Sequence, residues 1–301
     1  MGSKHSTEAS LVMLSRRLIG AVLTRKNQVV QSIGFREHLP LGKPSVTVGF
    51  LDQWGIDEIF LLDIDSGDWN SVEKLRVISE CSESCFVPLT VGGGIKSMND
   101  VRTAFKNGAD KVAICTEAQK NPKLLSMVSQ EYGDQAVVVQ VDFRRAGNDF
   151  MVCVNGGRET TDVTVLEFAG MLSDFDFGEL SLQSIDRDGM ETGLEIELIK
   201  QVKEIVPQPI IAMGGIGSHS QVKEGFSVAG AEAIAVGNML HFTEHSVTKI
   251  KRALCREGLG IRLDESFGYE GSSFDQRLRL NRKDCAELDR LKYVRHEPEF
   301  I

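Results

Sequence analysis

Aspartates and glycine clusters recur in this chain in one order and at nearly one spacing. The first copy consists of Glu58–Asp63, Val91–Ile95 and Gly108–Ile114, and the second of Glu179–Asp186, Met213–Gly217 and Gly230–Val236. The two copies are offset by 122 or 123 residues. A carboxylate can move protons, and a glycine cluster lets a phosphate approach bare backbone N–H groups. The pattern predicts a duplicated half-domain whose halves each carry such groups.

The elements that position these residues follow from hydrophobic periodicity. Short β-branched runs alternate with longer amphipathic stretches, which is typical of strand–helix units in a parallel sheet. A helix is expected over Ser97–Asn107, because Ser97 and Asp100 can cap its start and Gly108 follows its end. The eight expected strands are Leu18–Leu23, Glu58–Asp63, Phe86–Val91, Lys111–Ile114, Ala136–Asp142, Glu179–Gln183, Pro209–Met213 and Ala233–Val236.

Two halves of four units close most simply into an α/β fold, the (β/α)8 TIM barrel built from two duplicated half-barrels. Residues 13–263 are long enough for it. An open doubly wound sheet is the alternative, but it does not explain the duplication. We expect residues 1–12 to be a leader or tag, since Met13 follows them, and residues 264–301 to be a charged C-terminal extension that packs on the barrel or binds a partner.

The composition excludes several classes of function. The chain is 42% apolar and 26% charged with a net charge of −9, which is ordinary for a globular protein and argues against a general nucleic-acid surface. It has no apolar run long enough for a membrane span. Six cysteines without a secretory leader predict reduced thiols and a cytoplasmic location. The cysteines and histidines form no convincing ligand set, so we expect no metal and no cofactor.

The predicted fold determines where a site would lie. Catalytic groups of such barrels gather at the C-terminal ends of the strands, so Asp63, Asp142, Asp186 and both glycine clusters should share one face. The clusters follow the third and seventh strands, which places two phosphate sites on opposite sides of one mouth. That arrangement suits a small-molecule ligand with a phosphate at each end. Alternatively, the glycines only make tight turns.

At these motifs the chain resembles the cyclase subunit of imidazole glycerol phosphate synthase, from about Arg17 to Leu263. The matching motifs are Thr90–Ile95, Gly108–Thr116, Gln135–Val139 and Ser184–Gly189. The resemblance implies a barrel that accepts ammonia from a glutaminase subunit and releases it at the C-terminal face onto a bisphosphorylated substrate. An isomerase of histidine biosynthesis shares the phosphate loops but not the whole set.

The resemblance also implies roles for particular residues. Asp142 matches one of two catalytic aspartates, and Asp110 matches a residue at the glutaminase contact. The expected phosphate- or substrate-binding residues are Gly92, Gly93, Gly94, Thr116, Gln183, Asp188, Gly189, Gly214, Gly215 and Gly237. The expected ammonia gate consists of Arg17, Glu58, Lys111 and Glu179.

The opposite, gated end of the barrel also makes physical sense. Two cations and two anions around a narrow barrel base can satisfy one another, although strand-end charges are often merely solvated. The apolar residues expected to line a conduit above the gate are Val112, Ala113, Val138 and Ile234, which ordinary core packing explains equally well.

The departures from the family pattern lie on the reaction face. Leu23 stands where the second catalytic aspartate is expected, and the internal repeat agrees, since Val141-Asp142 corresponds to Val22-Leu23. A leucine cannot transfer a proton, so chemistry that needs two carboxylates cannot run unchanged. Gln31 stands for a substrate-binding lysine, Cys115 for an asparagine and Gln183 for a threonine.

These observations predict an ammonia-delivering subunit whose cyclase centre is altered. Family members with leucine after the first strand are associated with bacterial surface-polysaccharide pathways, where a glutaminase and a sugar amidotransferase form acetamidino groups. Two alternatives remain at this point. One is a genuine histidine-pathway cyclase that uses Asp142 with Asp65 or Asp188, and the other is a non-catalytic scaffold that activates a glutaminase.

Overall fold

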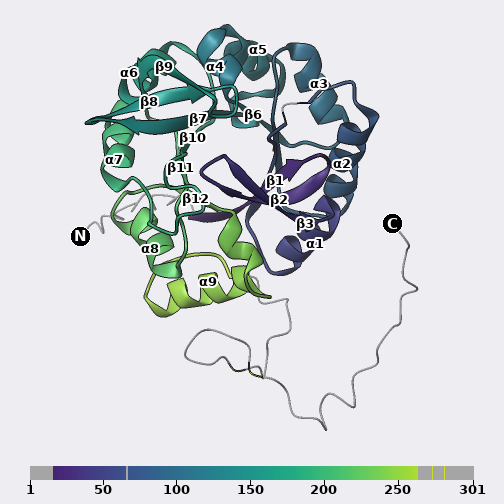
Figure 1. Cartoon of the computed structure of the whole chain (residues 1–301), viewed down its shortest axis with the longest axis vertical. Coiled ribbons are helices and arrows are strands. Elements are labelled where there is room, and N and C mark those ends of the chain that lie inside the picture. The colour runs from purple at the N-terminus through teal and green to yellow at the C-terminus, as the bar shows by residue number, and fades with distance from the viewer. Residues whose placement is uncertain (1–15, 66, 264–272, 274–280, 282–301) are drawn as a thin grey trace, which may run out of the picture. The chain divides into compact units, whose positions relative to one another are not determined.

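A computed structural model describes residues 16–65, 67–263, 273 and 281. In it, eight parallel strands form a closed ring in the order β1, β4, β5, β6, β7, β10, β11 and β12, and β12 pairs with β1 (Figure 1). The predicted (β/α)8 barrel is therefore confirmed. The expected leader and nearly all of the expected C-terminal extension lie outside the described residues, so those boundaries stay predictions.

The barrel strands lie close to their expected positions. They are β1 (Arg17–Arg25), β4 (Glu58–Asp63), β5 (Leu89–Gly92), β6 (Lys111–Ile114), β7 (Val137–Ala146), β10 (Glu179–Ser184), β11 (Ile210–Met213) and β12 (Ala233–Val236). β5 begins at Leu89 rather than at Phe86, because Pro88 has no N–H to donate to a ladder. β7 continues past Asp142, where it pairs with an additional antiparallel strand, β8.

Four antiparallel strands were missed by the sequence prediction. β2 (Gln28–Ile33) and β3 (Glu37–Gly42) extend from the end of β1, and β8 (Asp149–Val154) and β9 (Glu159–Thr164) extend from the end of β7. β8 begins 121 residues after β2, and β9 begins 122 residues after β3. The duplication therefore includes these hairpins, which continue from the C-terminal ends of the two equivalent barrel strands.

Helices surround the ring of strands (Figure 1). α3 (Met98–Lys106) begins after Ser97, which forms the expected capping box with Asp100, and α8 (His219–Ser227) repeats the device with Ser218 and Gln221. None of the described helices is long and apolar enough to cross a membrane. The others are α1 (Pro44–Gln53), α2 (Val72–Glu83), α4 (Thr116–Lys120), α5 (Lys123–Tyr132), α6 (Val165–Met171), α7 (Ile196–Ile205) and α9 (Ser246–Arg256), with 3-10 turns η1 (Asp134–Ala136), η2 (Leu172–Asp174) and η3 (Asn238–His241).

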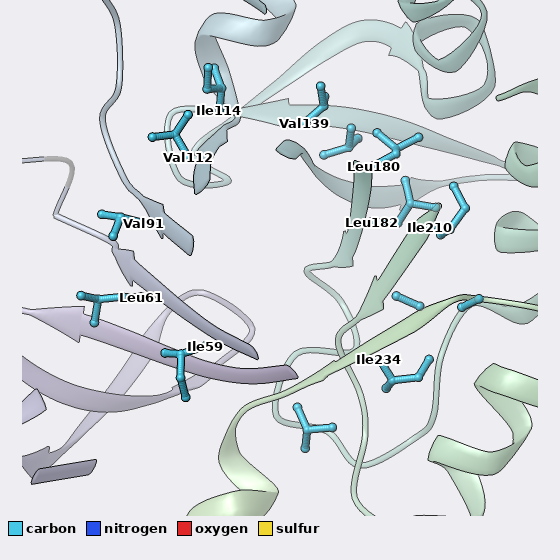
Figure 2. Close-up of a cluster of buried hydrophobic side chains, with 14 of the residues drawn as sticks. Ile59, Leu61, Val91, Val112, Ile114, Val139, Leu180, Leu182, Ile210 and Ile234 are labelled. Carbon is cyan, nitrogen blue, oxygen red and sulfur yellow. The ribbon is translucent and has the colours of Figure 1, made fainter. Parts of the chain in front are cut away.

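The core has an outer and an inner layer. The outer layer joins the barrel to the helices and includes Ile59, Leu61 and Val91 (Figure 2). The inner layer fills the barrel interior and includes Ala113 and Val138, as expected of residues lining a conduit. The same expectation was wrong for Val112 and Ile234, which belong to the outer layer (Figure 2). Strand side chains alternate between faces, so neighbours of the inward-facing Ala113, Ala233 and Ala235 must point outward.

Candidate functional site at the two ends of the barrel

Four charged side chains form a closed ring at the base of the barrel. Each of them is the first residue of its strand: Arg17 of β1, Glu58 of β4, Lys111 of β6 and Glu179 of β10. Arg17 Nη1 lies 2.7 Å from Glu58 Oε2, and its Nη2 donates to Glu179. Lys111 Nζ lies 3.1 Å from Glu58 and 2.6 Å from Glu179. Every charge thus contacts two of opposite sign, which brings all four expected gate residues together.

The ring is buried enough for its pairing to matter. Glu58 has a side-chain exposure of 1% and Glu179 of 9%, and the Thr90 hydroxyl also donates to Glu58 at 2.7 Å. Burial opposes ionisation of Glu179, but the hydrogen bond from Arg17 and the charges of Lys111 and Arg17 outweigh it, so its pKa lies below the ordinary value. The ring is therefore a neutral, fully paired constriction.

The C-terminal end holds a cavity of about 360 Å³. It lies between the two hairpins and the β5 loop, and Leu23 and Asp142 face it from opposite half-barrels. Five of the expected site residues line it, namely Gly93, Gly94, Thr116, Asp142 and Gln183. A volume of this size suits a small organic ligand.

A second, smaller cavity of about 30 Å³ adjoins the equivalent loops of the other half-barrel. Leu23 lines both cavities and so lies between them. The expected site residues at the second cavity are Asp188, Gly189, Gly214, Gly215 and Gly237. Neither set of described lining residues includes Gly92, which packs under the first loop where a Cβ would lie 2.7 Å from Leu62.

The glycine loops are tightly packed as well as exposed to the cavities. Gly93 has φ +108, and a Cβ there would overlap the carbonyl oxygen of Asp63. Gly215 has φ +92, and a Cβ there would overlap the carbonyl oxygen of Gly193. Only glycine fits such positions. Close packing therefore explains these two glycines without a ligand, while the same packing brings their backbone to the cavity walls.

Lys74 of α2 holds the first glycine loop in place and was missed by the sequence analysis. Its Nζ donates to the Gly93 carbonyl at 2.9 Å, lies 3.0 Å from Asp63 Oδ2 and sits 4.2 Å from the centre of the Trp69 ring. A lysine on an amphipathic helix normally reaches into solvent, so its sequence context gave no signal of this role. Asp63 is consequently a partner of Lys74, and it also lines the cavity.

Asp142 is a buried carboxylate without a cation in ion-pair distance among the described residues. Gln140 Nε2 donates to its Oδ1 at 2.9 Å, and the Cys115 thiol donates to its Oδ2 at 3.5 Å. Burial raises the pKa of Asp142, and these two hydrogen bonds only partly offset it. Burial and the neighbouring Asp142 charge raise the pKa of Cys115, which keeps it a thiol donor. A carboxylate tuned in this direction is suited to general acid–base work.

The main cavity is lined by both cations and carboxylates, and two of the cations are not neutralised by an ion pair. Lys96 and Arg158 line it and have no carboxylate partner within ion-pair distance among residues 16–65 and 67–263. Arg25 also lines it but lies 3.4 Å from Asp65. Two such cations beside a glycine loop and the Thr116 hydroxyl are suited to a phosphate. Gln31, in β2, is not among the described lining residues of either cavity.

Asp188 should make stability depend on pH. Burial raises its pKa from 3.8 to about 6, although the Ser32 hydroxyl at 2.7 Å and the Phe35 N–H oppose the rise. The folded state then favours the protonated acid, so its contribution is most favourable below the unfolded pKa and is lost as pH rises through about 6. The free energy of unfolding should fall by up to about 3 kcal/mol as pH rises from 3.8 through about 6, at about 1.4 kcal/mol per pKa unit. Asp188→Asn should abolish this fall.

Thermal or urea unfolding at about pH 4 and about pH 7 would measure this effect as the difference between the two proteins' pH slopes. Asn keeps the shape of the side chain and can still accept from Ser32 and Phe35. Identical slopes in the two proteins would show that Asp188 does not titrate in this range.

The protein is of the class of ligand-binding (β/α)8 barrels with two chemically distinct ends. Two cavities lie at its C-terminal end, and a ring of paired charges lies at its base. Comparison with known proteins narrows the class. The family described as histidine biosynthesis protein matches residues 17–246. The chain belongs to this family, and within it to the HisF group of imidazole glycerol phosphate synthase subunits.

Three relatives illustrate the similarity. A Vibrio vulnificus (strain YJ016) protein, provisionally named imidazole glycerol phosphate synthase subunit hisF2, is 36% identical over 87% of this chain and 97% of its own length. HisF subunits of Chloroherpeton thalassium (strain ATCC 35110 / GB-78) and Chlorobium phaeobacteroides (strain BS1) are 36% and 35% identical over 83% of this chain and their full length. The described barrel thus corresponds to essentially whole relatives.

Proposed function

We propose that this chain is the barrel subunit of a glutamine-dependent pair, which accepts ammonia at its base and delivers it to a phosphorylated acceptor at its C-terminal end. The observation that carries the proposal is the contrast between the ends. The Arg17–Glu58–Lys111–Glu179 ring is closed and paired, whereas Leu23 faces the cavity where the internal repeat has Asp142. The inlet is retained, but of the two equivalent strand-end positions only that of Asp142 carries a carboxylate for proton transfer.

The base of the barrel offers a surface for a glutaminase. Phe86 is 95% exposed in the loop before β5, where few residues of that size are left in water. A cavity of about 310 Å³ beside it is lined by Phe86, Pro88 and Asp110. Asp110 is exposed, but its Oδ2 accepts from the Leu89 N–H at 2.8 Å, so it also fixes the start of β5. An apolar anchor next to a hollow is typical of an interface centre.

The C-terminal end supports a phosphorylated acceptor rather than a bare scaffold. A protein that only activated a glutaminase would need neither the Asp142 cavity nor the cations Lys96 and Arg158 at its rim. We assign the acceptor to acetamidino-sugar formation in surface-polysaccharide synthesis, together with a sugar amidotransferase, and the location to the cytoplasm. All five cysteines in the described part of the chain are free thiols, which agrees with that compartment.

A histidine-pathway cyclase would need a second proton-transfer group beside Asp142. The two substitutes considered for Leu23 are both engaged elsewhere. Asp65 lies 3.4 Å from Arg25 and accepts from the Lys26 N–H. Asp188 accepts from Ser32 and lines the smaller cavity, and it is not among the described lining residues of the main cavity that Asp142 faces. We therefore favour altered chemistry over the family's standard cyclisation.

Complementation tests this choice. We expect the chain to leave a histidine auxotroph that lacks its cyclase subunit unable to grow, because Leu23 cannot transfer a proton. The medium should be rich in ammonium, so that growth does not depend on docking to the host glutaminase. A HisF subunit expressed in parallel serves as the positive control, and immunoblotting confirms the amount of each protein. Robust growth supported by this chain would reject the proposal.

A further inference from the structure

One wall of the barrel interior is polar. β7 and β10 are neighbours, with Gln140 opposite Ser181 and Asp142 opposite Gln183. Side chains alternate between the faces of a strand, and Glu179 and Asp142 both face the interior, so Gln140, Ser181 and Gln183 face it too. This wall runs from the ion-pair ring to the cavity.

Apart from the ring and Thr90, which donates to Glu58, the rest of the interior is apolar. The inner cluster comes mainly from the other strands and consists of Ile19, Ala21, Leu23, Val30, Phe60, Ala113, Val138, Ile211, Met213, Ala233 and Ala235. The polar side chains are therefore concentrated on one side. Gln140 and Gln183 also line the main cavity together with Ala113, so the cavity reaches inward to their level.

Three atoms of this wall are buried without a hydrogen-bond partner in the described part of the chain. They are Gln140 Oε1, Ser181 Oγ and Gln183 Nε2, in residues that are 6%, 0% and 2% exposed. Buried polar groups are nearly always paired in native proteins, and leaving them unpaired is costly. Apolar residues of similar size would pack here without that cost. The presence of three polar residues here instead points to a hydrogen-bonding partner that is not part of the protein.

The orientation of the two amides does not change this conclusion. Gln140 Nε2 donates to Asp142 at 2.9 Å and to Gln183 Oε1 at 3.2 Å, which leaves the carbonyl oxygen of Gln140 and the NH2 group of Gln183 without partners. If Asp142 is protonated, both amides can turn together, and Gln140 then offers the donor and Gln183 the acceptor. In either state the two amides, which are in contact with each other, offer one donor group and one acceptor group.

We propose that Gln140 and Gln183, beside Asp142, form a subsite at the inner end of the cavity for an uncharged group that carries an adjacent donor and acceptor, such as a primary carboxamide. The proposal rests on the proposed function, since it concerns the ligand of the same cavity. Lys96 and Arg158 then hold the phosphate of that ligand, and the glutamine pair recognises its opposite, uncharged end. Charges at the rim cannot distinguish one uncharged group from another, so recognition of this end requires the glutamine pair.

NMR of the full chain labelled at glutamine side-chain ¹⁵N tests the subsite. Acetamide should shift the side-chain amide signals of Gln140 and Gln183, whereas N,N-dimethylacetamide, which has no N–H, should bind at least tenfold more weakly. Gln183→Leu should weaken acetamide binding at least tenfold. Gln201→Leu, at an exposed position of α7, is the matched control and should leave it unchanged.

Two further measurements separate the possible failures. Thermal unfolding of Gln183→Leu should match or exceed the wild type, because the substitution removes an unpaired donor; a large loss of stability would indicate that the amide is structural and would overturn the subsite. Inorganic phosphate is titrated into the wild type in parallel. If phosphate binds but acetamide and N,N-dimethylacetamide bind equally or not at all, the subsite is wrong and the cavity's proposed role stands. If phosphate also fails to bind, that role fails as well.

Discussion

Lys111→Met should lower the free energy of unfolding by about 3–5 kcal/mol, the usual range for removing one partner of a buried ion pair. Methionine keeps much of the lysine stem but removes the Nζ that lies 2.6 Å from Glu179 and 3.1 Å from Glu58. Arg17 alone then faces two carboxylates, of which Glu58 is 1% exposed. Urea unfolding of the two proteins at neutral pH measures the difference.

Lys200→Met is the control for this substitution. Lys200 pairs with Glu197 at 2.8 Å on the outer face of α7, where the side chains are 39% and 81% exposed. Exposed pairs of this kind contribute about 0–1 kcal/mol, so the control should lose little stability. A loss at Lys111 no larger than at Lys200 would show that water reaches the ring and that it is not a sealed constriction.

The pH dependence of stability should distinguish Lys111→Met from the wild type. The pKa of Glu179 lies below its ordinary value of 4.5, so its pairing stabilises the wild type fully above that value and is lost as pH falls through the folded pKa. Without Lys111 the remaining cation holds the pKa of Glu179 down less. The stability difference between wild type and Lys111→Met should therefore narrow on acidification below about pH 4.5.

The barrel could be predicted because each strand is a β-branched run whose order repeats. The charged ring could also be predicted, since Arg17, Glu58, Lys111 and Glu179 all open strands, and strand starts of a closed barrel meet at one end. The hairpins could not: β3 contains Pro40 and β9 reads Glu-Thr-Thr-Asp-Val-Thr, so neither shows the alternation of a half-buried strand. Their pairing comes from β1 and β7, which extend beyond the barrel to meet them.

The polar parts of the site show why residue type alone is insufficient. Lys74 is buried only because Asp63, Trp69 and Gly93 come together around it from separate segments. Gln140 belongs to a run of valines, and its inward orientation follows from its parity with Asp142 rather than from its polarity. The same parity would have placed Val112 outside, since Lys111 and Ala113 face inward. The face of each strand residue therefore follows from one neighbour whose orientation is known, such as Lys111 for Val112.

Gly93→Ala should reduce the affinity for inorganic phosphate at least tenfold and destabilise the protein by several kcal/mol. A Cβ at this position overlaps the carbonyl oxygen of Asp63, which is backbone and cannot swing away, and φ is +108, where L residues are strained. The loop must shift as a unit, so the hydrogen bond from Lys74 to the Gly93 carbonyl at 2.9 Å should break too. Isothermal titration with phosphate and urea unfolding measure the two effects.

Gly147→Ala isolates the contribution of the overlap. Gly147 also has positive φ, +63, but a Cβ there meets nothing within 4 Å. This variant should be destabilised only by the strain of alanine in the left-handed conformation, about 1 kcal/mol, and should keep its phosphate affinity. If Gly93→Ala behaved like Gly147→Ala in both measurements, the β5 loop would be able to yield without consequence. Phosphate recognition would then have to come from the rim cations alone, because a loop that tolerates such a shift cannot hold backbone N–H groups in fixed positions.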